Sequence, residues 1–129
     1  MSSNQRVLIV EDEQILAENI KRFLDPRSAD VRIAEDGTCA MKMIESFSPD
    51  VVVLDYGLPV NNGLQTFVEL QRRSARPLGC VMITGYPLEK ITMLARPLGI
   101  RHFLSKPFRL TELQRLMEQS DRETSADAH

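Results

Sequence analysis

The feature that most constrains the fold of this chain is a fivefold alternation between short apolar runs and longer stretches with helical periodicity. Each run is followed by apolar residues three and four apart, the pattern of one buried helix face. Because the runs begin roughly 20 to 30 residues apart, the length of a strand and a crossover helix, they predict parallel strands. The expected strands are Arg6–Val10, Val31–Ala34, Val51–Leu54, Cys80–Ile83 and His102–Ser105.

The continuous apolar character of most of these runs indicates strands that are covered on both faces. A (βα)5 order of this kind predicts an α/β fold, a doubly wound three-layer sandwich with right-handed connections. Val31–Ala34 alternates between apolar and polar residues, so we expect it at an edge of the sheet. In such folds ligands bind outside the carboxyl ends of the strands, where the strand order reverses.

Size and charge narrow the classes of function. A chain of 129 residues has the size of one domain, and its net charge of -2 favours neither nucleic acid nor an anionic membrane as main partner. No apolar run is long enough to span a bilayer, and the N-terminus lacks the apolar segment of a signal peptide.

The two cysteines do not suggest a disulfide. Cys39 and Cys80 are interpreted as small apolar residues rather than a disulfide or ligand pair. We therefore expect a cytoplasmic protein.

Charged and hydroxyl side chains stand where the expected strands end. Glu11 and Asp12 follow the first strand, Asp55 the third, Thr84 the fourth and Lys106 the fifth. Because the carboxyl ends of parallel strands meet at one edge, we expect these five residues to converge. Each has an ordinary explanation when taken alone, such as helix capping by the acidic pair. Those explanations do not account for the whole set.

The chemistry of this set points to a cation and a phosphoryl group. Two carboxylates ~5 Å apart repel by roughly 3 kcal/mol at an effective dielectric constant of about 20, and one lysine does not offset three. Carboxylate oxygens suit Mg²⁺ or Mn²⁺. A carboxylate beside such a metal can attack a phosphoryl group, while the metal, an ammonium and a hydroxyl hold its oxygens.

Four segments in this order and spacing resemble the receiver domain of two-component response regulators. They are VLIVEDE, VVVLDYGLPVNNG, ITG and LSKPF, and the resemblance covers about residues 5 to 119. It implies a flavodoxin-like sheet of strand order 2-1-3-4-5. It also implies that Asp55 is the phosphoacceptor, which takes a phosphoryl group from a phosphohistidine with Mg²⁺. Asp12 would be the direct metal ligand with Glu11 assisting, and the backbone carbonyl of Gly57 would complete the protein ligands.

The resemblance assigns further roles around the phosphoacceptor. Thr84 and Lys106 would bind phosphoryl oxygens, and the Lys106–Pro107 bond matches a peptide that is usually cis. Phe103 matches a switch aromatic that moves together with Thr84 and alters the surface of the fourth helix, fifth strand and fifth helix. Gly57 and Tyr86 occupy positions that modulate the lifetime of the phosphorylated state. Such a module catalyses only its own phosphorylation and dephosphorylation, so we do not expect an enzyme with a separate substrate.

Three other functions fit the residues less well. A phosphatase similar to the haloacid dehalogenases needs a second aspartate two residues after the nucleophile, where this chain has Gly57. A flavin-binding flavodoxin-like module needs a hydroxyl- and glycine-rich phosphate loop, whereas Glu11, Asp12 and Glu13 would repel phosphate. A degenerate receiver that takes no phosphate does not agree with a complete site.

Residues 1–120 are expected to form the receiver domain, and residues 121–129 a polar tail or the stub of a linker. Pro97 predicts a short fourth helix that ends at or before Arg96, which places standard dimer contacts through that face in doubt. The expected partners are a sensor histidine kinase or a histidine phosphotransfer protein, and a downstream protein or a C-terminal effector domain outside this chain. A phosphorylation-dependent homodimer is a further expectation, whereas direct binding to nucleic acid or to a membrane is not.

Overall fold

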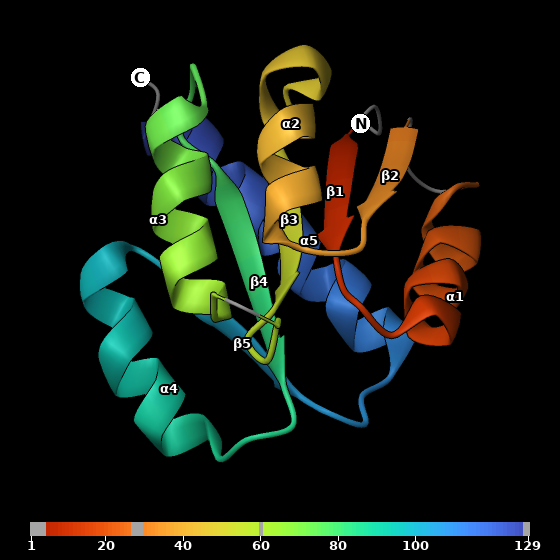
Figure 1. The fold of residues 1–129 in the computed structure, drawn as a ribbon, viewed down its shortest axis with the longest axis vertical. Helices are drawn as coiled ribbons and strands as arrows, with labels where there is room; N and C mark the ends of the chain where they lie inside the picture. The colour runs from red at the N-terminus through yellow and green to blue at the C-terminus, as the bar shows by residue number, and fades with distance from the viewer. Residues whose placement is uncertain (1–4, 27–29, 60, 128–129) are drawn as a thin grey trace.

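The computed structural model describes residues 5–26, 30–59 and 61–127, with side chains up to residue 120. Strands and helices alternate along the chain (Figure 1). The strands are β1 (Arg6–Val10), β2 (Asp30–Ala34), β3 (Val51–Asp55), β4 (Gly79–Thr84) and β5 (His102–Ser105). The helices are α1 (Gln14–Leu24), α2 (Gly37–Phe47), α3 (Gly63–Arg73), α4 (Leu88–Ala95) and α5 (Leu110–Asp127), with a short 3-10 helix, η1 (Arg96–Leu98), after α4.

The five strands form one parallel sheet of order β2-β1-β3-β4-β5, which confirms the predicted fold class and strand order. β2 lies at an edge, as its alternating sequence predicted. From β1 the chain proceeds to β2 on one side, and from β3 it proceeds to β4 on the other. The strand order therefore reverses between β1 and β3, and this is where a parallel sheet of this kind binds ligands.

Alternate residues of each central strand face opposite layers of helices. In β3, Val51 and Val53 belong to the core that α1 and α5 cover, whereas Val52 and Leu54 belong to the core that α2, α3 and α4 cover. Figure 1 shows these two layers on either side of the sheet. All five residues of β3 are buried, including Asp55 at its end. The period of two residues along a strand thus yields two cores from one apolar run.

A close backbone approach fixes the start of α3 against the end of β3. A Cβ atom added to Gly63 would lie 2.8 Å from the backbone oxygen of Asp55 and 2.8 Å from Cα of Tyr56. The amide of Gly63 donates a hydrogen bond of 2.8 Å to the carbonyl oxygen of Tyr56. Asn62 then begins the helix with a capping box, in which it exchanges hydrogen bonds with Gln65. The turn that follows the phosphoacceptor candidate is therefore tightly packed.

The fourth and fifth helices differ from each other in where they end. α4 ends at Ala95, as Pro97 predicted, and η1 then leads to Gly99, whose φ of 94° suits a residue without a side chain. α5 instead continues to Asp127, so the expected polar tail is helical up to that residue, which the loss of apolar periodicity did not predict. A domain boundary at residue 120 stays a prediction. In the part of the chain described here, no helix combines the length and apolarity needed to cross a membrane.

Candidate functional site

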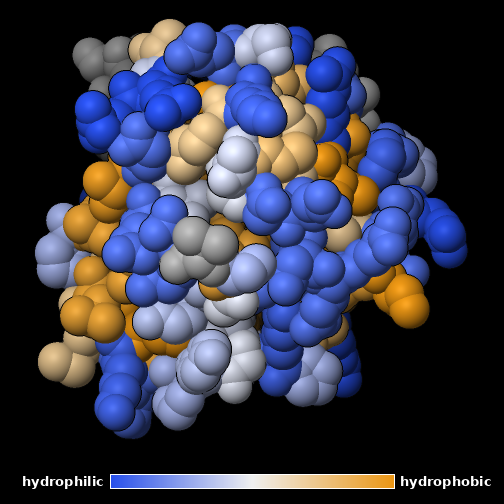
Figure 2. All heavy atoms as spheres, in the orientation of Figure 1, coloured by the Kyte–Doolittle hydropathy of each residue, from blue (hydrophilic) through white to orange (hydrophobic). Residues whose placement is uncertain are grey.

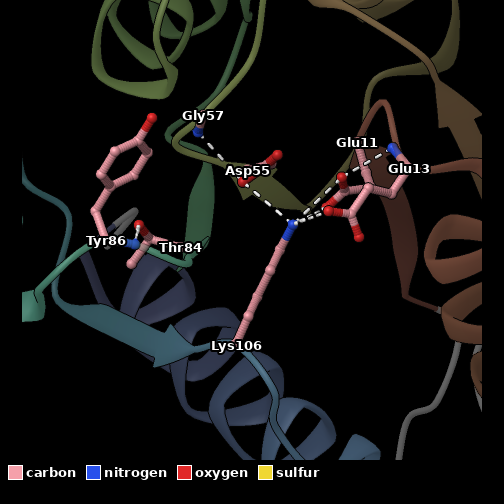
Figure 3. A network of polar contacts seen from close by, with 7 residues as sticks. All are labelled: Glu11, Glu13, Asp55, Gly57, Thr84, Tyr86 and Lys106. Atoms are coloured by element: carbon pink, nitrogen blue, oxygen red, sulfur yellow. Dashed lines mark hydrogen bonds and ion pairs between the residues drawn. The ribbon is translucent and has the colours of Figure 1, made fainter.

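Four of the residues predicted from the sequence lie together at the carboxyl edge of the sheet (Figure 3), and they are Glu11, Asp55, Thr84 and Lys106. Asp55 ends β3 and Glu11 directly follows β1, so the two carboxylates stand at the point where the strand order reverses. Thr84 ends β4, and Lys106 directly follows β5. The amide of Lys106 donates a hydrogen bond of 2.8 Å to the carbonyl oxygen of Thr84, which ties the two strand ends together.

Three carboxylates converge in this site. One oxygen from each of Glu11, Asp12 and Asp55 lies within 4.8 Å of the others. Glu11 and Asp55 are 1% and 5% exposed, whereas Asp12 is open to solvent. An all-oxygen donor set of this kind, buried on one side and open to water on the other, fits a hard divalent cation that keeps part of its hydration.

Gly57 lies beside the same carboxylate. Its amide donates a hydrogen bond of 3.2 Å to Oδ1 of Asp55. This contact places the residue at the site, and ligation by its backbone carbonyl stays a prediction.

Burial makes the negative charge of this cluster costly. Burial is the main cause that raises the pKa of Glu11 to about 7. The hydrogen bond from the Glu13 amide lowers this pKa, and repulsion from Asp55 raises it further. Burial also raises the pKa of Asp55, although the ammonium of Lys106 and the hydrogen bond from Gly57 oppose it. The two buried carboxyls therefore hold protons more strongly than free ones do, and a cation would replace those protons.

Lys106 is the counter-charge within the site. Its Nζ lies 3.2 Å from Oε1 of Glu11, 3.3 Å from Oε2 of Glu13 and 3.6 Å from Oδ1 of Asp55. Partial burial opposes the charge of Lys106, but the carboxylates of Asp55 and Glu11 outweigh it and raise the pKa of the amine. The Lys106–Pro107 peptide bond is cis, which confirms the expectation for this pair.

Glu13 is a site residue that the sequence reasoning missed. It is the third acidic residue of the run Glu-Asp-Glu, and the only sign of its role was that run. It precedes α1 as the N-cap residue, but its side chain makes no capping hydrogen bond and extends to Lys106 instead. Its amide donates a hydrogen bond of 3.0 Å to Oε2 of Glu11, so Glu13 touches both partners of the ion pair.

Thr84 and Tyr86 lie on the other side of Asp55 from Glu11 and Glu13 (Figure 3). Thr84 is fully buried, and its hydroxyl oxygen accepts a hydrogen bond of 2.8 Å from the amide of Tyr86. Because a hydroxyl also has one hydrogen to donate, this bond leaves the O–H of Thr84 available to another acceptor.

The ring of Tyr86 stands between solvent and the β3–α3 turn. It packs edge-on against Tyr56, with ring centroids 5.5 Å apart and planes at 78°. It lines a groove of about 490 Å³ together with Gly57, Leu58 and Lys90. Tyr86 is 57% exposed, so its ring covers the site only in part.

Phe103 lies on β5, where it pairs with Met82 of β4. It is a partly buried residue of β5 that packs against the core covered by α2, α3 and α4. Its partial exposure agrees with the position of a switch aromatic, and its movement stays a prediction.

Comparison with known proteins agrees with this geometry. The sequence model described as the response regulator receiver domain matches residues 7–118. A curated relative, response regulator MprA of Mycobacterium sp. (strain KMS), is 32% identical over 122 residues, which are 95% of this chain and 53% of that protein. The chain thus spans about half the length of the curated relatives it matches.

Solved structures show the same fold. A CheY-like response regulator receiver domain protein from Methanospirillum hungatei JF-1 superposes with a TM-score of 0.86 at 22% identity, covering 97% of this chain and 99% of that one. A response regulator from Burkholderia pseudomallei, solved with a phosphorylated aspartic acid and a calcium ion, gives a TM-score of 0.82 at 21% identity, with 97% and 73% covered.

Proposed function

The chain belongs to the response regulator receiver domain family, and from this premise we propose that Asp55 accepts a phosphoryl group from the phosphohistidine of a histidine kinase or histidine phosphotransfer protein. The observation that carries the proposal is the convergence of buried Asp55 with Glu11, Asp12 and Lys106 at one edge of the sheet. This arrangement offers a nucleophile, oxygen ligands for a cation and an ammonium within one site.

In the proposed reaction, a carboxylate oxygen of Asp55 attacks phosphorus and the phosphorus–nitrogen bond of the donor breaks. The imidazole leaves with the bonding electron pair, and an acyl phosphate remains on Asp55. A bound Mg²⁺ or Mn²⁺ supplies charge neutralisation to the phosphoryl oxygens. Glu11, Asp12, Asp55 and the carbonyl of Gly57 are the groups that would hold this cation.

Lys106 and Thr84 complete the proposed clamp. The ammonium of Lys106 lies 3.6 Å from Oδ1 of Asp55 and so is placed to pair with one phosphoryl oxygen. The O–H of Thr84 would donate to another oxygen, with the oxygen atom of the hydroxyl already held by the Tyr86 amide. A positive charge or a donor that already lies near the reacting carboxylate stabilises the charge that develops during transfer.

The output of the proposed switch lies on α4, β5 and α5. A movement of Thr84 toward the phosphoryl group would leave space that Phe103 fills, and this would shift the population between two packings of that surface. α4 and η1 carry the exposed apolar side chains Met93, Leu94 and Leu98. Figure 2 shows orange atoms gathered over the side of the molecule where Figure 1 places α3 and α4.

The partners follow from the same proposal. A downstream protein, an effector domain outside this chain or a second phosphorylated copy would read the α4–β5–α5 surface, within the cytoplasm. The domain would turn over no separate metabolite, and it would act on itself through phosphoryl capture and slow hydrolysis, with Gly57 and Tyr86 setting the lifetime of the phosphorylated state.

The test is incubation with acetyl phosphate and Mg²⁺, followed by intact mass measurement. We expect a gain of one phosphoryl group that is lost in Asp55→Asn and in the presence of EDTA. Circular dichroism of the variant controls for folding. A wild-type protein that is folded, loaded with Mg²⁺ and still unlabelled by both acetyl phosphate and a phosphorylated histidine phosphotransfer protein would contradict the proposed function.

A further inference from the structure

The ammonium of Lys106 lies within ion-pair distance of three carboxylates, and it donates hydrogen bonds to two of them, Glu11 and Glu13. Its contact with Oε2 of Glu13, at 3.3 Å, is shorter than its contact with Oδ1 of Asp55, at 3.6 Å. In Figure 3 Glu13 lies on the other side of the ammonium from Asp55. The Lys106 side chain is 19% exposed, so few water molecules are available to replace these partners. Glu13 thus draws the ammonium away from the place where a phosphoryl group would arrive.

Glu13 differs in kind from the other two acidic partners of Lys106. Glu11 and Asp55 belong to the group whose oxygens converge within 4.8 Å, and Glu13 does not. When a cation occupies that group, the charges of Glu11 and Asp55 are neutralised, and Glu13 is the carboxylate that stays available to Lys106. Its side chain is 61% exposed and makes no capping hydrogen bond to α1.

We propose that Glu13 is a positioning residue that competes with the phosphoryl group for Lys106 and thereby slows phosphoryl capture by Asp55. This inference rests on the proposed function, and it identifies Glu13 as a residue that limits the rate of phosphoryl capture. Before transfer, the ammonium is shared between Glu13 and Asp55. During transfer it must give up Glu13 to pair fully with a phosphoryl oxygen, and breaking that ion pair adds to the barrier.

The size of the effect follows from the exposure of Glu13. Exposed ion pairs contribute little, so loss of this one is expected to raise the rate constant by about 1.5- to 5-fold. Glu13→Gln removes the charge at nearly constant size. Glu13→Asp keeps the charge but shortens the side chain by one methylene, which moves it out of reach of Lys106 and toward the role of a helix cap. Both variants are therefore expected to accelerate phosphorylation.

The experiment measures the second-order rate constant for acetyl phosphate at saturating Mg²⁺, by intact mass. Glu18→Gln is the matched control, because Glu18 is an exposed glutamate of α1 for which no contact with Lys106 is seen among the described side chains. Its rate is expected to equal the wild-type rate. A second readout is the NMR signal of the Lys106 Cε methylene in the metal-loaded protein, which should move in Glu13→Gln and stay in place in Glu18→Gln.

The possible outcomes separate the inference from the function beneath it. If the wild type is labelled and Glu13→Gln is labelled at the same rate or more slowly, the inference is overturned. Equal acceleration in Glu13→Gln and Glu18→Gln would also overturn it, since net charge would then explain the result. A folded wild type that is never labelled would overturn the proposed function and the inference with it.

Discussion

A Cβ atom at Gly57 would lie 3.4 Å from Cε2 of Tyr86 and 4.0 Å from Oδ1 of Asp55. The absence of a side chain at residue 57 thus leaves a space bordered by the tyrosine ring on one side and the carboxylate on the other. The ring of Tyr86 also packs edge-on against the ring of Tyr56. The space at Gly57 and the ring of Tyr86 both lie where they could alter the access of water to an acyl phosphate on Asp55, and this is a physical reason to expect that they affect its lifetime.

The first prediction concerns Tyr86→Ala. Removal of the ring exposes the acyl phosphate on Asp55 to water, so loss of the phosphoryl group should become faster. Because Tyr86 is 57% exposed and shields the site only in part, we expect an increase of less than about tenfold, or less than ~1.4 kcal/mol in barrier. The rate is measured by intact mass after removal of the donor. Tyr86→Phe, which keeps the ring, should behave as wild type, and an unchanged rate in Tyr86→Ala would rule out shielding.

The second prediction concerns the cation. Asp12 is the exposed member of the converging carboxylates, and Asp12→Asn replaces a charged oxygen ligand with a neutral one. The affinity for Mg²⁺, measured by calorimetry, should fall by at least about tenfold. Glu18→Gln serves as the control, because it removes an equal charge from outside the converging group. Equal losses in the two variants would show that the cation responds to net charge and not to ligation.

The fold could be predicted because buried parallel strands have a recognisable pattern of apolar residues in the sequence. Runs such as Val51–Leu54 are apolar on both faces only when helices cover both faces, and the spacing between runs then fixes the crossover units. The same logic placed Glu11, Asp55 and Lys106 together, since each directly follows or ends a strand. Strand ends are set by the backbone, so residues there can be located without knowledge of side-chain conformation.

Contacts that depend on the reach of a side chain could not be predicted in this way. Glu13 was expected to be no more than part of an acidic run, because the sequence does not tell whether its carboxylate caps α1 or turns to Lys106. The end of α5 could not be predicted for another reason. Residues 121–127 lack an apolar period but contain neither glycine nor proline, and a helix that has already formed can continue through such a segment.

The third prediction concerns Gly63, at the turn behind the phosphoacceptor. In Gly63→Ala the new methyl group would lie 2.8 Å from backbone atoms of Asp55 and Tyr56, which cannot move without disturbing the end of β3. The free energy of unfolding should fall by about 1–3 kcal/mol. Gly85→Ala is the control, because a Cβ atom there meets nothing within 4 Å. Urea denaturation checks both variants, and a Gly63→Ala protein as stable as Gly85→Ala would contradict the close approach.

The last prediction concerns the stability of the metal-free protein. Glu11 and Asp55 both have raised pKa values in the folded state, and burial is the first cause in each case. A carboxyl with a raised folded pKa binds its proton more tightly in the folded than in the unfolded chain. The contribution of these two carboxyls to stability is therefore largest at acidic pH. The contribution of Glu11 is lost as the pH rises from the ordinary pKa of a glutamate through about 7.

Asp55→Asn removes one of the two buried, mutually repelling carboxylates. In EDTA at pH 7.5 the variant should be more stable than the wild type by about 1 kcal/mol or more. This gain should shrink at pH 5, where Glu11 of the wild type holds a proton and no longer repels the carboxylate of Asp55. Urea denaturation at the two pH values measures it. Asp30→Asn, at an aspartate whose side chain is 43% exposed, should change stability by less than about 0.5 kcal/mol at either pH. If Asp55→Asn is instead less stable at pH 7.5, attraction to Lys106 outweighs burial, and the site is held together by its ion pairs even without a cation.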